Sequence, residues 1–373
     1  MKKSFSLIFL IFLSLFSAQE KVEKPQSHSL EDPKSWSMVI LPDTQNYAKW
    51  NRNQPIFDLM TRWIEDHVEE LNIKMVLHVG DIVEHNNILN QGYDGDQSAQ
   101  KQWEAMQTSL GRLNGLVPYI TATGNHDMSI NEKGERRSRV DEFFPIDFNS
   151  LNKKALRMNL YNEQGDPSLE NAAYELKDLN GVDYLFLCLE YAPKDETLEW
   201  AKKVVDLPEY NNHRVIVLTH AYLNAKSERT SGEVKWFQYA PFVVNNVPQK
   251  NPTMRLPRSN NGEQIFQKLI QPSSNIEMVF SGHISGEGFK LDKNSENKIV
   301  SQMLFDQQSV GGGHRNGNGG DGWLRILEFH PDNQTVTVKT FSPLFWISPS
   351  TREKAYRKEA KDEFQFKLSK PKP

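Results

Sequence analysis

The amino-acid sequence predicts an α/β protein, in which helices cover a sheet of short buried strands. Six apolar runs have the length and composition of such strands, and each ends in polar or glycine-containing residues. Apolar residues at helical spacing separate the first three of these runs. Residues able to bind metal ions recur where the strands end, which is where α/β proteins carry their functional groups. We therefore expect the functional site at the strand ends.

The expected elements follow one another along the chain. The strands are SMVIL (37–41), IKMVLHVG (73–80), VPYITATG (117–124), VDYLFLCLE (182–190), RVIVLTH (214–220) and NIEMVFSG (275–282). Two helical sets are Ile56, Met60, Trp63, Ile64, Val68 and Leu71, which follow Pro55, and Trp103, Met106, Leu110 and Leu113. The segments 174–187 and 324–341 predict hairpins with Asn-Gly and Pro-Asp-Asn turns, and therefore a second, more antiparallel sheet.

The first residues, MKKSFSLIFLIFLSLFSAQE, have the layout of a secretory signal peptide. Two lysines precede an apolar run, and small residues follow it. A retained membrane anchor is the alternative, but the run is shorter than the roughly 20 apolar residues that cross a bilayer. We expect a signal peptide at 1–18, a polar linker at 19–35, a secreted or periplasmic protein, and no membrane span after cleavage.

Composition restricts the class of partner and the source of stability. The net charge is −4, which gives no overall basic field, so no stable nucleic-acid partner is expected. The single cysteine, Cys188, lies in an apolar strand, where a buried residue is a better explanation than a reactive thiol. With no internal disulfide possible, an exported protein of this size depends on its core, and on any bound metal, for stability.

Three further segments have open alternatives. Residues 226–262 lack periodicity and predict a long surface insertion, which either recognises substrate or only packs. The glycine-rich loop at 311–322 is either a mobile flap over a site or a connector. Residues 350–373 form a charged tail that alternates basic and acidic residues, which is typical of a solvated helix, so the domain itself is expected at 36–349.

Five of the expected strands end in residues that bind metal ions. The segments are PDTQ (42–45), GDIVEH (80–85), GNHD (124–127), THAY (219–222) and GHIS (282–285). Taken singly, each has a structural explanation, with Asp43 as a helix cap, Asn125 as a turn former and His220 as a satisfied core histidine. Capping and turn formation do not explain why the same residue types recur at five strand ends. The recurrence favours a metal centre.

This order of motifs resembles the calcineurin-like metallophosphoesterase family, whose pattern is Asp-x-His, Gly-Asp, Gly-Asn-His-Asp or Gly-Asn-His-Glu, a histidine, and Gly-His-x-His. The resemblance spans about residues 38–283. It implies a four-layer αββα sandwich of two mixed sheets flanked by helices. It also implies two metal ions that share Asp81 as a bridge. The implied ligands are Asp43, Gln45, Asp81 and Ser285 for the first ion, and Asp81, Asn125, His220 and His283 for the second.

The sequence departs from the family pattern at two ligands of the same ion, where Gln45 and Ser285 replace imidazoles. The second position keeps two histidines and suits Mn, Fe or Zn. The first position becomes oxygen-rich, because glutamine ligates only through its amide oxygen and serine is a weak neutral ligand. It is therefore expected to favour Mn, Mg or Ca. Glu287 is either an additional carboxylate ligand there or a solvated loop residue.

The resemblance implies hydrolysis of a phosphomonoester or phosphodiester by metal-hydroxide attack. His126 is the family's residue for protonating the leaving group, and Glu84 stands where an acid orients that histidine. The expected partner is a phosphorylated small molecule or a phosphodiester, and cleavage at a pyrophosphate bond is not distinguished. The alternative is a non-catalytic, metal-containing binding module on the same fold, which the two lost imidazoles favour. Retention of His126 and of all four ligands of the second ion favours the enzyme.

Overall fold

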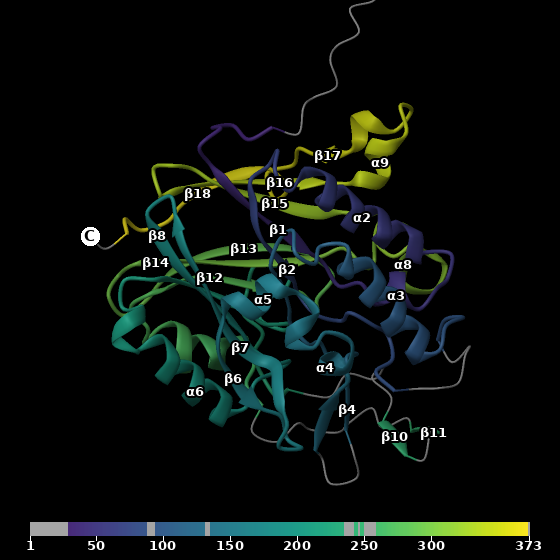
Figure 1. Cartoon of the computed structure of the whole chain (residues 1–373), viewed down its shortest axis with the longest axis horizontal. Coiled ribbons are helices and arrows are strands. Elements are labelled where there is room, and N and C mark those ends of the chain that lie inside the picture. The colour runs from purple at the N-terminus through teal and green to yellow at the C-terminus, as the bar shows by residue number, and fades with distance from the viewer. Residues whose placement is uncertain are drawn as a thin grey trace, which may run out of the picture.

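Two mixed sheets lie at the centre of the computed structural model, which describes residues 29–87, 94–130, 135–234, 242–244, 247–249 and 259–371 (Figure 1). The first sheet has the order β17-β16-β15-β1-β2-β3, and β18 also pairs with β16. Within it, β1, β2 and β3 are parallel, and β15 pairs antiparallel with β1. Its strands are β1 (Trp36–Leu41), β2 (Ile73–His78), β3 (Tyr119–Thr121), β15 (Leu324–Phe329), β16 (Thr335–Phe341), β17 (Tyr356–Arg357) and β18 (Phe364–Lys367).

The second sheet has the order β13-β14-β12-β9-β8-β7-β6. Four neighbouring strands in it, β8, β9, β12 and β14, are parallel, and the strands outside them pair antiparallel. Its strands are β6 (Leu156–Tyr161), β7 (Pro167–Leu179), β8 (Val182–Cys188), β9 (Arg214–Leu218), β12 (Ile276–Ser281), β13 (Gly286–Lys293) and β14 (Ile299–Asp306). Seven parallel strands in the two sheets therefore supply the ends at which a site can form.

Helices cover the outer face of each sheet, so the predicted four-layer αββα sandwich is confirmed (Figure 1). α2 (Gln54–His67) and α3 (Ala99–Gly111) pack on the first sheet, and α6 (Asp195–Val205) and η3 (Phe266–Ile270) pack on the second. The shorter elements are α1 (Gln45–Ala48), β4 (Met128–Ile130), β5 (Arg136–Ser138), α4 (Val140–Phe143), η1 (Ile146–Phe148), α5 (Ser150–Ala155), η2 (Pro208–Tyr210), β10 (Phe242–Val244), β11 (Val247–Gln249), α7 (Gly262–Ile265), α8 (Gly313–Asn316), α9 (Pro343–Ile347) and η4 (Arg352–Lys354).

Side-chain alternation along the strands explains why both faces of each sheet are apolar. In β1, Met38 and Ile40 belong to the core between the sheets, whereas Val39 and Leu41 belong to the core beneath α2 and α3. Successive side chains of a strand point to opposite faces, so a continuous apolar run is what a strand buried on both faces requires. Cys188 is fully buried in the central core, as predicted.

Both predicted hairpins are present, but they belong to different sheets. β7 and β8 pair antiparallel around Asn180 and Gly181, which have φ of 54° and 78°. Asparagine and glycine tolerate these left-handed conformations, which a tight two-residue turn requires. The second hairpin, β15 with β16, extends the first sheet beside β1 rather than the second sheet. The expected concentration of antiparallel strands in one sheet is therefore wrong, since each sheet is mixed.

The C-terminal segment is not the solvated helix that its charges predict. β17 and β18 both pair with β16, and Phe366 of β18 is buried opposite Val336. The alternation Phe364, Gln365, Phe366, Lys367 places both aromatic rings on one face, which is a strand pattern. These strands extend the sheet past the boundary expected at residue 349.

Several sequence predictions fall outside the described residues. These are the signal peptide at 1–18, most of the linker at 19–35, and residues 235–241, 245–246 and 250–258 of the expected insertion. Within the part of the chain that the structure describes, no helix combines the length and apolar character needed to cross a membrane.

Candidate metal centre

The carboxyl ends of the seven parallel strands meet at one edge of the sandwich, and each is followed by a polar residue. In chain order these residues are Asp43, Asp81, Asn125, Glu190, His220, His283 and Asp306, and Asp306 is itself the last residue of β14. Their convergence follows from the parallel arrangement, because parallel strands of one sheet end on the same side.

The ligands predicted for the second ion come together. One ligand atom from each of Asp81, His220 and His283 lies within 4.8 Å of the other two. The Nδ1 atom of His220 lies 2.8 Å from the backbone carbonyl of Val79, which can only accept, so Nδ1 carries the proton. The Nε2 atom of His220 is therefore left to bind an ion, and it lies 3.2 Å from Asp81 Oδ2.

A further observation indicates that this position fits a metal. The Oδ1 atom of Asn125 is buried without a hydrogen-bond partner, and the buried Nε2 atom of His220 has the ion-pair contact with Asp81 but no hydrogen bond of good geometry. Buried polar atoms are rarely left unsatisfied, and here both atoms are ones that metals accept as ligands. The residues predicted from the sequence thus fit a divalent ion at the histidine-containing position.

The backbone around these ligands is tightly constrained. A Cβ atom at Gly124 would lie 2.0 Å from Asp81 Oδ1, and one at Gly282 would lie 2.0 Å from Asp43 Oδ1. The glycines of the GN and GH motifs are therefore needed to make room for carboxylate ligands. Asp81 and His283 themselves have positive φ values of 52° and 72°. Such conformations are uncommon outside glycine and cluster at functional sites.

The oxygen-rich position is held together by two glutamines. Asp43 accepts hydrogen bonds from the backbone N–H of His283 at 3.0 Å and from Gln308 Nε2 at 3.2 Å. The Nε2 atom of Gln45 lies 3.3 Å from Asp81 Oδ2 and 2.6 Å from Gln308 Oε1. The remaining amide oxygen of Gln45 is buried and has no hydrogen-bond partner. Gln45 and Asp43 therefore lie beside Asp81, as the motif order predicts.

Ser285 and Glu287 do not join Asp43, Gln45 and Asp81 at this position. Ser285 is exposed, and its hydroxyl lies 2.6 Å from the hydroxyl of Ser309 and 3.4 Å from Asp306 Oδ2. Glu287 forms ion pairs with Arg357 at 2.7 Å and Lys361 at 3.2 Å, so it is neither a solvated loop residue nor placed to ligate. The cations that hold Glu287 come from the C-terminal segment, whose position the sequence did not predict.

Buried negative charge accumulates around the oxygen-rich position. Burial raises the pKa of Asp43 well above its usual value, and the nearby carboxylates of Asp306 and Asp81 raise it further. Burial likewise raises the pKa of Asp306 to about 6. Burial acts in the same direction on Asp81, but His220 and His126 outweigh it and lower its pKa. Carboxylates in such a position require either protons or cations.

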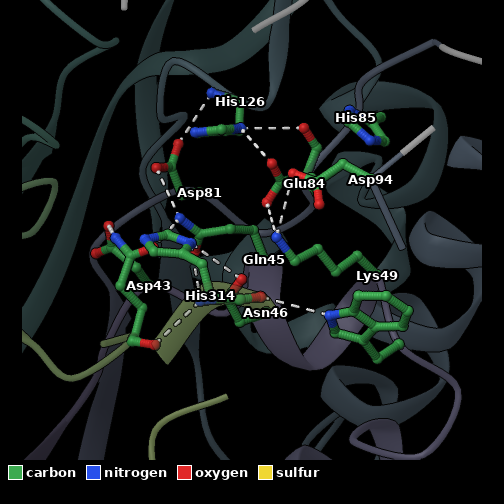
Figure 2. A network of polar contacts seen from close by, with 12 residues as sticks. Asp43, Gln45, Asn46, Lys49, Asp81, Glu84, His85, Asp94, His126 and His314 are labelled. Atoms are coloured by element: carbon green, nitrogen blue, oxygen red, sulfur yellow. Dashed lines mark hydrogen bonds and ion pairs between the residues drawn. The ribbon is translucent and has the colours of Figure 1, made fainter. Parts of the chain in front are cut away.

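His126 stands beside Asp81 and is held by a second group of charges (Figure 2). Its backbone N–H donates to Asp81 Oδ1 at 2.9 Å, and its Nδ1 atom lies 3.1 Å from the backbone carbonyl and 3.6 Å from Oε1 of Glu84. Burial lowers the pKa of His126, but Glu84 and Asp81 outweigh it and leave the pKa above its usual value. This arrangement favours the charged form of His126, which is the form that a general acid needs.

The residues that hold Glu84 were not predictable from the sequence motifs. Lys49 is fully buried, and its ammonium lies 3.1 Å from Glu84 Oε2 and 3.4 Å from Asp94 Oδ2. Burial raises the pKa of Glu84 to about 7, although His126 and Lys49 both act to lower it. Lys49 lies just after the four-residue α1 and outside the PDTQ motif, so no motif marks it as a site residue. Asp306 and Gln308 were also missed, but there the signal existed, because the apolar run IVSQMLFD ends in aspartate like the other strands.

The glycine-rich loop at 311–322 lies beside the centre. Its His314 ring contacts Asn46 of α1 (Figure 2), and the carbonyl of Gly317 accepts a hydrogen bond from Asn53 at 3.1 Å. A Cβ atom at Gly319 would lie 2.4 Å from the ring of Tyr47, so this glycine permits close packing on α1. The loop thus packs on the helix that follows Asp43.

Fold and site together identify the family of the chain. The chain belongs to the calcineurin-like phosphoesterase family, whose sequence model matches residues 39–286. This family membership implies a dinuclear metal centre. The Bacillus subtilis (strain 168) protein YvnB is 30% identical over 315 residues, a region that makes up 83% of this chain and 20% of YvnB. The chain thus spans about a fifth of that relative's length.

Two solved structures are similar over most of the chain. Purple acid phosphatase PPD1 from yellow lupin (Lupinus luteus) seeds matches with a TM-score of 0.49 and 15% identity, covering 89% of this chain and 54% of the lupin chain. GAP50, the anchor in the inner membrane complex of Plasmodium, matches with a TM-score of 0.44 and 12% identity, covering 91% of this chain and 90% of GAP50.

Proposed function

We propose that this chain is an exported phosphoesterase that hydrolyses a phosphomonoester or a phosphodiester. The observation that carries the proposal is the position of His126, whose backbone is bonded to Asp81 and whose Nδ1 atom faces Glu84. A protein that only binds has no chemical need for a histidine whose charged form is favoured beside its metal ligands. Export rests on the N-terminal sequence, and a secreted or periplasmic location follows from it.

The proposed centre holds two different ions. Asp81, Asn125, His220 and His283 would hold Mn, Fe or Zn, and Asp43, Gln45 and Asp81 would hold Mn, Mg or Ca. When bound, the pair of ions supplies the positive charge that activates water and neutralises phosphate oxygens. Asp81 is suited to link the two positions, because Oδ2 lies near both His220 and Gln45 while Oδ1 accepts from the backbone of His126.

Side chains of the protein supply the proton for the leaving group and hold its donor in position. With Nδ1 of His126 directed at Glu84, its other ring nitrogen is the one able to give a proton to the departing oxygen. Glu84 favours the charged form of His126, and Lys49 holds Glu84 in place. Tyr191 packs beside the proposed ligand His283, with the two ring centroids 5.4 Å apart. The glycine-rich loop, which contacts Asn46 and Asn53, is the segment that we propose to lie next to bound substrate.

A panel assay tests the proposal. The purified protein is incubated with p-nitrophenyl phosphate and bis-p-nitrophenyl phosphate, with Mn, Zn, Fe, Mg or Ca added singly and in pairs. Turnover that disappears in Asp81→Asn is expected, because this substitution removes the charge shared by both ions. Metal bound without turnover of either ester, under every condition, would instead support the non-catalytic binding module. Export is tested by deleting residues 2–18, which should retain the protein in the cytoplasm.

A further inference from the structure

We propose that Asp306 is a ligand of the oxygen-rich metal position, where it takes the place of the imidazole that Ser285 does not provide. The inference rests on the proposed metal centre and extends it by one residue outside the motifs. It also explains how the oxygen-rich position can hold an ion although Gln45 and Ser285 stand where the family has imidazoles.

Sheet topology brings Asp306 to the centre. β14 is parallel to β12, with Leu304 opposite Ser281, so the end of β14 lies next to the segment that carries His283. On its other side, Asp306 is opposite Gly286, one residue after Ser285. Asp306 therefore reaches the position from the strand adjacent to the GHIS segment.

The contacts of Asp306 connect it with the first metal position. Its Oδ2 atom accepts a hydrogen bond from Gln308 Nε2 at 2.8 Å, and the same nitrogen donates to Asp43 Oδ2 at 3.2 Å. The hydroxyl of Ser285 lies 3.4 Å from Asp306 Oδ2 and closer to Ser309. Ser285 thus contacts the carboxylate of Asp306 from an exposed position, and the side-chain amide of Gln308 lies between Asp306 and Asp43.

The charge of this position calls for a cation. Asp43 and Asp306 are both fully buried, and no lysine or arginine of the described residues forms an ion pair with either. Some buried carboxylates of the protein have a basic partner, as Glu84 has Lys49 and Glu277 has Arg214, whereas Asp127 is held by backbone N–H groups. A buried carboxylate without such a partner is costly unless it binds a proton or a metal.

An independent observation points to an ion at this position. Gln45 is 1% exposed, and its Oε1 atom is buried without a hydrogen-bond partner. The nitrogen of the same amide contacts Asp81 and Gln308, so the amide group that carries the unsatisfied oxygen lies next to the carboxylate of Asp81. Amide and carboxylate oxygens are the ligands that hard divalent cations prefer. Rotation of the Gln308 amide would take its N–H donors out of the gap and allow Asp43 and Asp306 to approach the ion.

Mn²⁺ binding to the metal-free, full-length protein tests the role of Asp306 without any substrate. Calorimetric titration and elemental analysis of the wild type should show one tightly and one weakly bound ion. Asp306→Asn should leave the tight ion and weaken the other at least about tenfold, since affinity for hard cations follows the number of charged ligands. Ser285→Ala is the matched control, and it should change the binding affinity of neither ion by more than about threefold.

Three results would overturn the inference. The first is an Asp306→Asn isotherm identical to that of the wild type. The second is an equal loss in Ser285→Ala, which would return the ligand role to Ser285. The third is a metal-free Asp306→Asn protein that unfolds at a lower temperature and binds both ions more weakly, which would mean that Asp306 only shapes the site. Failure of hydrolysis with both ions bound would contradict the proposed function but not this ligand assignment.

Discussion

Replacing Lys49 by methionine is expected to slow the hydrolysis of esters with poor leaving groups, because Lys49 holds the carboxylate that faces His126. The ammonium lies 3.1 Å from Glu84 Oε2, and the two side chains are 1% and 2% exposed. The other oxygen of Glu84 lies 3.6 Å from His126 Nδ1. Lys49 thus acts on the leaving-group acid through one intermediate residue.

The magnitude follows from the protonation state of Glu84. Removing one member of a buried ion pair costs about 3–5 kcal/mol, unless the remaining group becomes neutral. The pKa of Glu84 is already about 7 because of burial, so loss of Lys49 raises it further and leaves Glu84 protonated at neutral pH. A neutral Glu84 no longer supports the charge on His126. Lys49 also opposes that charge directly, but Glu84 has the larger effect, so the pKa of His126 falls.

Rates on good and poor leaving groups measure this effect. We expect kcat for an alkyl phosphate ester to fall about tenfold or more, which is part of the 10²–10⁴ that a general acid contributes, while a nitrophenyl ester is affected less. The alkaline limb of the pH profile should move to lower pH, because His126 loses its proton earlier. Equal losses on both esters, or an unmoved alkaline limb, would refute the chain of contacts from Lys49 to His126.

Glu84→Gln is the matched control for Lys49→Met. It removes the carboxylate charge, keeps the side-chain shape, and leaves Lys49 paired with Asp94. It should reproduce the dependence on the leaving group with a smaller loss of stability. Combining both substitutions should restore stability relative to Lys49→Met but not the rate, since the two residues act in one pathway. Independent, additive losses of rate in the double variant would contradict this.

Three further predictions concern the same centre. His126→Ala should lower turnover by about a hundredfold or more while elemental analysis finds the metal content unchanged, and equal losses for good and poor leaving groups would exclude proton donation. Gln45→His combined with Ser285→His should tighten the first position and shift it toward Zn or Fe, so that a dialysed sample holds about two ions per chain where the wild type holds about one. In the metal-free protein, burial raises the pKa of Asp306 to about 6 and that of Asp127 to about 7, from 3.8. The stability that these two groups contribute is fully present below pH 3.8 and is lost as the pH rises through 6 and 7. The thermal unfolding temperature, measured in the presence of a chelator, should therefore fall over this pH range. Added Mn²⁺ should reduce the part of this fall that is due to Asp306.

The elements that carry the centre were predictable because their signals are local. An apolar run such as VIL in β1 is long enough to specify a strand buried on both faces, and the residue after it shows what lies at the sheet edge. The hairpin at Asn180 and Gly181 was predictable for the same reason, since two neighbouring residues determine the turn. The motif order then related these strand ends to one another.

What the sequence did not show depends on distant partners. Lys49 has the composition of a surface residue, and only the approach of Glu84 and Asp94 makes its burial favourable. The strands β17 and β18 are two and four residues long, so their pattern is too short to outweigh a charged composition until β16 provides a partner. Glu287 was misassigned for a related reason, because its cations come from this C-terminal segment.

The two sides of the centre obtain positive charge from different sources. On the side of His126, the cation is part of the chain, since Lys49 forms an ion pair with Glu84 and holds it in position. On the side of Asp43 and Asp306, the described residues provide neutral hydrogen-bond donors, namely the Gln308 amide for both carboxylates, the His283 backbone for Asp43 and the Ser285 hydroxyl for Asp306. A neutral donor cannot neutralise a carboxylate. The proton donor is therefore organised whether or not metal is present, whereas the oxygen-rich position is completed by an exchangeable ion. Loss of metal should then remove the charge that acts on phosphate while leaving the leaving-group acid in place.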